Sequence, residues 1–287
     1  MPTATAAQPR EAPSVDAQEL ASTIGVTLVS QMPVGESGGA YEVVTDSGAR
    51  AVLKLESALV ADFAVPHAIT HALRARGCPV PAVLEHGTVA GLRYEVIELL
   101  PGDPVTQLTP ALVPEILRVH ELLYELDRPG RAPWIEDMVT SVTEGRSGYC
   151  EHAALRAHDP DLLDRLRAIA ARAANADTPT IDAVHYDFSP LNIPAEGDRV
   201  TGVVDWNGAT SGDASFDLVT LAFYTHDAEA HATLLGHARA RTDPRALQLY
   251  AAHMVLRQLD WSLRYHPEQL EWFTDLGHAL LAEVGAG

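Results

Sequence analysis

The spacing of hydrophobic positions changes partway along the chain. Between residues 27 and 99, short apolar runs alternate with turn residues, which predicts β-strands at residues 27–33, 41–45, 49–55, 80–85 and 92–99. From residue 109 onward, apolar side chains recur every three or four positions, which predicts helices over 112–123, 162–169, 218–224, 228–241, 244–264 and 267–284. This order predicts an α+β protein, with a small antiparallel sheet in its N-terminal lobe and a mostly helical C-terminal lobe.

Composition supports a similar division. Residues 1–15 are rich in Ala, Pro and Thr, which predicts a disordered tail, and a short helix is expected over 15–24. Residues 16–100 then form the N-terminal lobe and residues 101–287 the C-terminal lobe. Residues 128–150 are rich in Gly, Pro and Trp, which predicts a loop with short helices.

The composition is that of a globular protein. The 287 residues are 47% hydrophobic and 21% charged, enough to bury a substantial core. We see neither a membrane-length apolar run nor a signal peptide, so the expected location is the cytoplasm. Cys78 and Cys150 have no metal-site spacing and are expected to be free thiols.

The charge of the chain narrows the choice of partners. The net charge of −19 argues against nucleic acid as a partner. Residues 101–287 hold 28 acidic and 14 basic residues, a net of −14. A substrate cleft in this part would attract a cation, although the same charge could simply keep the protein in solution.

The basic residues contain one exception. Nineteen of the twenty are Arg, and Lys54 is the single Lys. Pairing the two strands around Ser47 places Lys54 opposite Ala40, beneath a Gly-rich turn. Such a turn can bring backbone N–H groups onto a phosphate, which a lysine beneath it would also contact. The residues of this predicted phosphate site are Gly35, Ser37, Gly38, Gly39 and Lys54. An ordinary hairpin turn is the alternative.

Polar residues follow apolar runs at three places between residues 184 and 218. The turn at residues 195–198 predicts a hairpin that lays Asn192 close to Asp205, with Asp187 beside the same open end. Carboxamide and carboxylate oxygens gathered in this way suit Mg²⁺, which is usually held by one or two protein groups and substrate phosphates. A further carboxylate there could act as general base for an alcohol. A hairpin with polar ends would be the plain structural interpretation.

These residues resemble the aminoglycoside phosphotransferase family, which has a bilobal protein-kinase-like fold. The motifs that carry the resemblance are His185-x-Asp187-x4-Asn192, Asp205-Trp206 and Asp213-x3-Asp217. The resemblance implies that Asp187 is the catalytic base and that Asn192 and Asp205 hold Mg²⁺. It also implies that three residues brace the loops: His185, Asp213 and Asp217.

Two further family features are expected in the N-terminal part. The segment 98–102 resembles the interlobe hinge, where the backbone of Glu98 and Leu100 would meet the nucleotide base. A plain exit from the strand is the alternative. The family also pairs its lysine with a helix glutamate, but residues 61–73 have no Glu at that distance. Asp62 or Glu56 might take its place, so this partner stays unassigned.

In the family, the helical C-terminal part recognises the phosphate acceptor. Carboxylates suit ammonium groups, and aromatic faces suit cations or rings. The acceptor-binding candidates are Asp227, Asp260, Trp261, Glu271 and Trp272. Of these, Asp227 and Asp260 are preferred, and a solvated helix surface is the alternative for each.

The expected function is transfer of the γ-phosphate of ATP or GTP, with Mg²⁺, to a hydroxyl of a cationic small molecule. An aminoglycoside or basic peptide antibiotic is favoured, which would make the protein a resistance enzyme. Two alternatives stay open: a metabolic kinase acting on choline, homoserine, sugars or fructosamines, and a nucleotide-binding regulatory module without turnover. A protein kinase is not supported, because Asp205-Trp206 replaces Asp-Phe-Gly and no Ala-Pro-Glu follows.

Overall fold

The structure is a computed structural model that describes residues 17–32, 39–57, 63–126 and 133–285. Contacts between Cα atoms divide the chain into two compact units. The first contains residues 1–63 and 81–100, and the second contains residues 64–80 and 101–287. The predicted N-terminal lobe covered residues 16–100, so residues 64–80 differ in their assignment.

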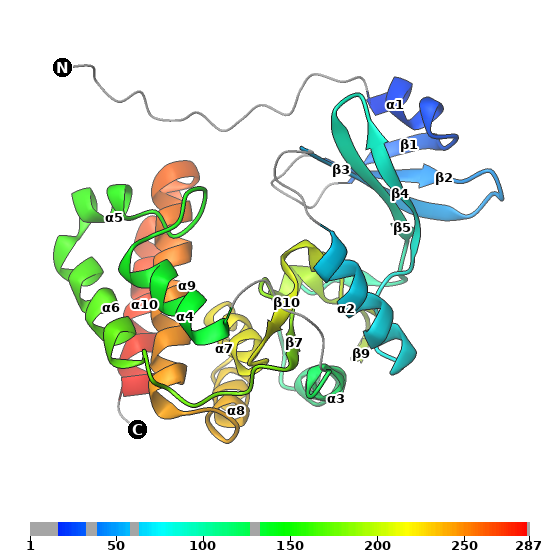
Figure 1. Ribbon diagram of the computed structural model, residues 1–287. Helices are drawn as coiled ribbons and strands as arrows, with labels where there is room; N and C mark the ends of the chain where they lie inside the picture. The colour runs from blue at the N-terminus through cyan, green and yellow to red at the C-terminus, as the bar shows by residue number, and fades with distance from the viewer. Residues whose placement is uncertain (1–16, 33–38, 58–62, 127–132, 286–287) are drawn as a thin grey trace, which may run out of the picture. The chain divides into compact units, whose positions relative to one another are not determined.

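The first unit is a five-stranded antiparallel sheet with one helix. Its strands follow the order β1-β2-β3-β5-β4. The elements are α1 (Ala17–Thr23), β1 (Thr27–Gln31), β2 (Ala40–Val44), β3 (Arg50–Ser57), β4 (Val83–Val89) and β5 (Leu92–Glu98). The strand predictions are confirmed to within a few residues at their ends. Figure 1 shows α1 next to β1, with the hairpin strands beyond it.

The two faces of this sheet differ in character. Leu53 packs in a core cluster with Leu20 of α1 and Val96 of β5. Side chains alternate across a strand, so Lys54 lies on the other face from Leu53. The register pairs Lys54 with Ala40 on β2, as the hairpin pattern predicted, and with Glu95 on β5.

The second unit is mainly helical. Its helices are α2 (Ala64–Ala75), α3 (Val113–His120), α4 (Trp134–Thr143), α5 (His152–His158), α6 (Pro160–Arg172), α7 (Ser215–Phe223), α8 (Ala228–Arg239), α9 (Pro244–Tyr265) and α10 (Leu270–Gly285). Single 3-10 turns are η1 (Glu121–Leu123), η2 (Pro190–Asn192), η3 (Trp206–Gly208) and η4 (Pro267–Gln269). Short strands are β6 (Asp103–Pro104), β7 (Asp182–Val184), β8 (Pro194–Glu196), β9 (Arg199–Val200) and β10 (Thr210–Gly212).

Helix α9 is the central element of this unit. It begins where the Asp243 side chain accepts the N–H of Arg245 and Pro244 takes the first turn, as the Asp-Pro sequence predicted. It packs against α4, α5, α6, α7 and α10, which Figure 1 shows gathered around it. Most of its residues from Ala246 to Ser262 are therefore buried.

Two helix predictions needed adjustment. Residues 134–143 form the regular helix α4 within the segment predicted as a loop, because Trp134, Met138 and Val142 recur at helical spacing and are buried. After His266 the chain first makes the turn η4, and α10 begins at Leu270. Among the described residues, none of the helices combines the length and hydropathy needed to cross a bilayer.

Candidate active site

The loop after β7 is held by strand pairing on both sides. β7 pairs antiparallel with β10, so that Val184 lies opposite Thr210. β8 and β9 form the predicted hairpin, with Glu196 opposite Arg199. Beyond the hairpin, the N–H of Val204 donates to the carbonyl of Asn192 at 2.9 Å. Asn192 is therefore joined to the residue that directly precedes Asp205.

His185 connects the two polar loops of the motif. Its Nε2 lies 2.8 Å from the carbonyl oxygen of Val204, and its Nδ1 accepts the N–H of Asp187 at 3.3 Å. A carbonyl can only accept and an amide N–H can only donate, so the ring is neutral and carries its proton on Nε2. The ring is fully buried and lies 4.5 Å, between centroids, from that of Trp206. His185 thus supports the loop and has no exposed atom for chemistry.

Asp217 of α7 holds the same loop from beneath. Its Oδ2 accepts the N–H of His185 at 2.7 Å, and its Oδ1 accepts the N–H of Tyr186 at 3.0 Å. The side chain is fully buried, and burial raises the pKa of Asp217 to about 7 although both hydrogen bonds oppose the shift. Tyr186 has the positive φ of 76°, an unfavourable conformation for a residue with a Cβ. Its two backbone contacts therefore have to be supplied by neighbours.

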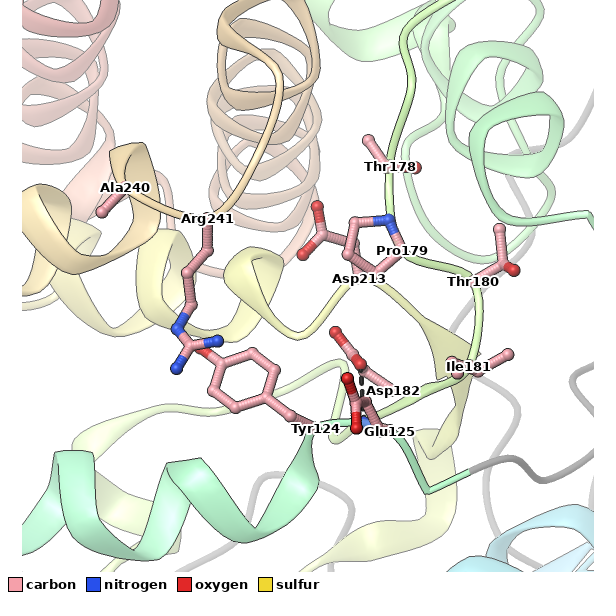
Figure 2. A pocket seen from close by; sticks show the side chains of 10 residues that line it. All are labelled: Tyr124, Glu125, Thr178, Pro179, Thr180, Ile181, Asp182, Asp213, Ala240 and Arg241. Carbon is pink, nitrogen blue, oxygen red and sulfur yellow. Dashed lines mark hydrogen bonds between the residues drawn. The ribbon is translucent and has the colours of Figure 1, made fainter.

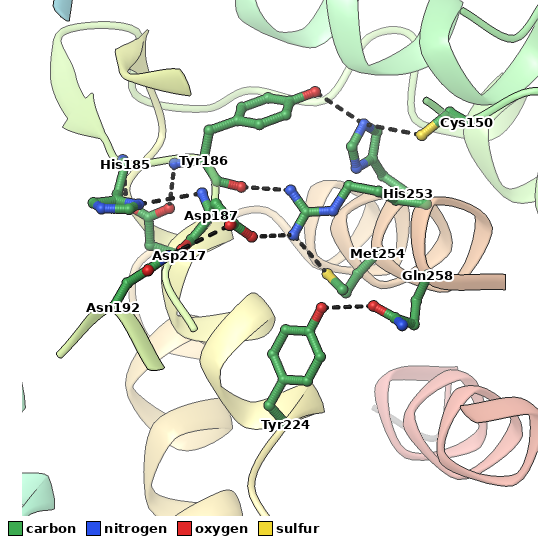
Figure 3. Close-up of polar contacts among 11 residues, drawn as sticks. Cys150, His185, Tyr186, Asp187, Asn192, Asp217, Tyr224, His253, Met254 and Gln258 are labelled. Carbon is green, nitrogen blue, oxygen red and sulfur yellow. Dashed lines mark hydrogen bonds and ion pairs between the residues drawn. The ribbon is translucent and has the colours of Figure 1, made fainter. Parts of the chain in front are cut away.

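Asp187 is the exposed carboxylate of this loop, with a side chain 54% accessible. The Asn192 amide donates to the Asp187 carbonyl at 2.8 Å and lies 3.4 Å from Oδ2. The Nη2 of Arg257, on α9, lies 3.2 Å from Oδ1. Figure 3 shows Asp187 between Asn192 and the polar residues of the helix. The sequence gave no signal for Arg257, which is 70 residues away in a helical pattern.

Asp205 follows in a strained turn. It has φ 66° and ψ 56°, the left-handed conformation, and its side chain does not cap η3. Such strain in a non-glycine residue occurs most often at functional sites. Trp206 is buried and its Nε1–H donates to the carbonyl of Val203, which anchors the turn. The backbone thus fixes where the Asp205 carboxylate starts.

The donors in this region suit Mg²⁺ shared with a phosphate. Asn192 uses its NH₂ end within the loop, which leaves its amide oxygen as the end suited to a cation. Among the described residues, no three His, Cys, Asp or Glu side chains gather into a closed metal site. One carboxamide and one carboxylate are nevertheless the usual protein share for Mg²⁺ when substrate phosphates complete the coordination.

The first unit carries the predicted phosphate-binding residues. Lys54 is half-buried, and the residue opposite it on β5 is Glu95, which is 4% exposed. A Cβ at Gly39 would lie 2.5 Å from the carbonyl oxygen of Leu55, so only glycine fits there. The remaining predicted residues of the turn, and the possible lysine partner Asp62, lie outside the described residues: Gly35, Ser37 and Gly38.

The partner and hinge predictions can also be placed. Helix α2 contains no Asp or Glu, so it offers no carboxylate to the lysine. Glu56 lies two positions from Lys54 and faces the same side of β3. Glu98 ends β5, where its N–H donates to the carbonyl of Ala82 and its side chain accepts the Ala82 N–H. Leu100 is the last residue of the first unit.

Comparison with known proteins identifies the family. The model described as the phosphotransferase enzyme family matches residues 29–256, which is most of the chain. The chain belongs to this phosphotransferase enzyme family. It is therefore a kinase that uses an alcohol group as acceptor, as the sequence predicted. A search of curated protein sequences gave no match.

Solved structures with similar folds are also phosphotransferases. Aminoglycoside phosphotransferase APH(4)-Ia is 20% identical, with a TM-score of 0.70 over 94% of this chain and 98% of that chain. Amicoumacin kinase hAmiN is 14% identical, with a TM-score of 0.63 over 94% of both chains. Choline kinase LicA from Streptococcus pneumoniae is 17% identical, with a TM-score of 0.58 over 93% and 95%. These likenesses confirm the predicted α+β, protein-kinase-like fold of the phosphotransferase.

A cavity of about 560 Å³ lies behind β7 of the phosphotransferase. Asp182 and Asp213 line it together with Tyr124 and Arg241, as Figure 2 shows. Asp213 is fully buried and accepts hydrogen bonds from the N–H of Ser215 at 2.9 Å and from two side-chain hydroxyls. Burial raises the pKa of both carboxyls. These groups hold the chain before and after β10 and serve the architecture of the site.

The acceptor candidates lie in different environments. Asp260, which we had preferred, is fully buried and is paired with Arg264 at 2.7 Å and with the N–H of Glu151 at 3.0 Å. It is therefore committed to α9 packing, and the prediction that it meets substrate is wrong for this structure. Asp227 caps α8 by accepting the N–H groups of Glu229 and Ala230, so capping accounts for this residue.

The remaining candidates stay accessible. Trp261 is half-buried with its ring 4.4 Å from that of Tyr265, between centroids. Trp272 is 44% exposed and lies against His226. Glu271 is exposed in the first turn of α10. Trp261 is one helical turn beyond Arg257, which places it on the face of α9 that holds Asp187.

Proposed function

We propose that this phosphotransferase moves the γ-phosphoryl group of ATP or GTP, with Mg²⁺, onto a hydroxyl of a cationic small molecule in the cytoplasm. An antibiotic is the favoured acceptor, as a resistance mechanism. The observation that carries the proposal is the position of Asp187. Its exposed carboxylate is held beside the Asn192 amide, and Asn192 is joined by its backbone to the residue before Asp205.

The proposed roles follow from the chemistry of each group. The acceptor oxygen attacks the γ-phosphorus while the bond to the β–γ bridging oxygen breaks, and the nucleoside diphosphate leaves with that electron pair. Asp187 accepts the proton of the acceptor hydroxyl. Asn192 and Asp205 would hold Mg²⁺, which neutralises phosphate charge when bound. Lys54 and the backbone of the turn that includes Gly39 would position the phosphates, and the backbone of Glu98 and Leu100 the base.

The acceptor class rests on charge and on the similar proteins. Residues 101–287 carry the net charge of −14 counted from 28 acidic and 14 basic residues, which favours a cation. The structures of similar proteins contain hygromycin B with ADP in one case and amicoumacin with AMP-PNP in another. Trp261, beside the loop on α9, is the aromatic candidate best placed to meet the acceptor, with Trp272 and Glu271 farther along the chain.

A metabolic role is the second candidate. Choline kinase LicA shares the fold over nearly the whole chain, and its named substrate is also a cationic alcohol. Both candidates predict the same catalytic residues. They differ in which alcohol supports turnover.

One experiment separates these candidates and tests the chemistry. Nucleoside diphosphate release would be measured with ATP and GTP, with magnesium, across a panel of aminoglycosides, basic peptide antibiotics, choline, homoserine and sugars. We expect an antibiotic to give the highest kcat/KM, and Asp187→Asn to lower turnover by at least ~10² while remaining folded. Turnover near wild type in Asp187→Asn would remove the proposed base. Turnover with neutral or anionic alcohols alone would remove the cationic acceptor.

A further inference from the structure

Arg257 bridges the central helix of the second unit to the proposed catalytic loop. Its Nη1 donates to the carbonyl oxygen of Tyr186 at 2.6 Å, and its Nη2 lies 3.2 Å from Oδ1 of Asp187. One planar guanidinium thus contacts two consecutive residues of the loop. This requires the fixed fork of an arginine, because an ammonium is a single compact charge.

The surroundings of Arg257 hold its side chain in place. The side chain is 14% exposed, whereas that of Asp187 is 54% exposed. The guanidinium carbon lies 5.8 Å from the centroid of the Tyr186 ring, and Nη2 also lies 3.3 Å from the sulfur of Met254. The charged group is therefore directed at the loop from a mostly buried position, and the accessible partner of the pair is the carboxylate.

The contacts of Arg257 complete the fixation of a strained peptide. Tyr186 has φ 76°, and its N–H is held by Asp217 from α7. Its carbonyl is held by Arg257 from α9. The residue before Asp187 is thus fixed at both ends by two different helices, as Figure 3 shows for the labelled loop residues and Asp217. The direction in which Asp187 leaves the backbone depends on both.

We propose that Arg257 is a positioning residue of the phosphotransfer reaction. It acts through Asp187 by holding Oδ1, while the rest of the exposed carboxylate stays available to the acceptor hydroxyl. The inference rests on the proposed role of Asp187 as base and adds a residue that the sequence motifs do not contain. A displacement of the base by about an ångström can lower turnover ~10²-fold, so the effect belongs to kcat.

Three variants test the role: Arg257→Gln, Arg257→Lys and Arg257→Ala. The probe is nucleoside diphosphate release from ATP or GTP with magnesium, with water as acceptor and again with the best alcohol of the panel. We expect Arg257→Gln to lower kcat by about 10- to 100-fold, the effect of losing a charge-assisted hydrogen bond, with KM for nucleotide within about twofold of wild type. Arg257→Lys should retain more turnover than Arg257→Gln. Guanidinium at concentrations far below those that unfold proteins should restore part of the activity of Arg257→Ala, and sodium chloride should not.

Arg264→Gln is the matched control, because Arg264 lies on the same helix and pairs with Asp260 away from the loop. It should lower the melting temperature and leave kcat near wild type. A kcat within about twofold of wild type in Arg257→Gln would overturn the inference. So would equal losses in all three Arg257 variants without rescue by guanidinium, because the effect would then come from general disruption. If Asp187→Asn keeps its turnover, the proposed function fails. If Asp187→Asn is inactive and Arg257→Gln is unaffected, only the role of Arg257 fails.

Discussion

Both carboxylate oxygens of Asp217 accept backbone N–H groups from the loop that carries Asp187, and the donors are His185 and Tyr186. The contact places a fully buried carboxyl beneath the proposed catalytic base. Burial raises the pKa of Asp217 to about 7. The fold of the loop is thereby coupled to the protonation of a group outside the reaction.

Stability should therefore depend on pH through Asp217. Its pKa is higher in the folded protein than in the unfolded chain, where an Asp titrates near 4, so the folded state binds the proton more tightly. The contribution of Asp217 to the free energy of unfolding should be greatest below pH ~4 and should decline as the pH rises to about 7, by up to ~1.4 kcal/mol per pH unit. Urea unfolding at several pH values would show this decline in wild type and its absence in Asp217→Asn. Parallel curves for the two proteins would contradict the prediction.

Magnesium should be required for turnover, and Asp205 should set its affinity. A chelator should abolish nucleoside diphosphate release, and added Mg²⁺ should restore it. We expect Asp205→Asn to raise the Mg²⁺ concentration for half-maximal turnover by about 10-fold or more, because one anionic ligand is lost. Asp198→Asn, on the exposed turn of the nearby hairpin, is the control and should not shift the magnesium curve. An equal shift in both variants would show a general charge effect.

Lys54 and Glu95 should act together on nucleotide binding. They are opposite one another on β3 and β5, and opposite charges in such a pair attract. Lys54→Met should weaken kcat/KM for the nucleotide by about 10- to 100-fold, the effect of losing a charged contact to phosphate. Glu95→Gln should weaken it less, and it should add little in the Lys54→Met background. Full additivity in this double-mutant cycle would show that the two residues are independent.

Gly212 of β10 should tolerate no side chain, because an added Cβ would overlap the ring of Trp134. Trp134 is buried, and its Nε1–H donates to the Tyr250 hydroxyl at 2.8 Å, so the ring cannot move away freely. Gly212→Ala should lower the free energy of unfolding by about 1–3 kcal/mol. Gly236 in α8 has open space around its Cα, and Gly236→Ala should raise that free energy by about 0.5–1 kcal/mol. Denaturant titrations of both variants would check this contrast.

Local patterns were sufficient for much of the fold. The turn around Ser47 predicted the pairing of Lys54 with Ala40, because side-chain alternation and a short turn fix the register of a hairpin. Helix α4 was missed as a regular helix because Gly and Pro residues flank it, although its buried positions recur at helical spacing. Asp260 was misjudged for a different reason. A helical pattern does not show which polar residue faces a partner within the fold, and Arg264 pairs with it there.

The sequence by itself determined the reaction class of this protein. Asp187, Asn192 and Asp205 lie within one short stretch, and their spacing depends only on a loop and a hairpin, which are local structures. The tertiary structure alone brought Arg257 to Asp187 and placed Asp217 beneath the loop. These contacts depend on how α7 and α9 pack around a shared core, and no local pattern of residues records that packing.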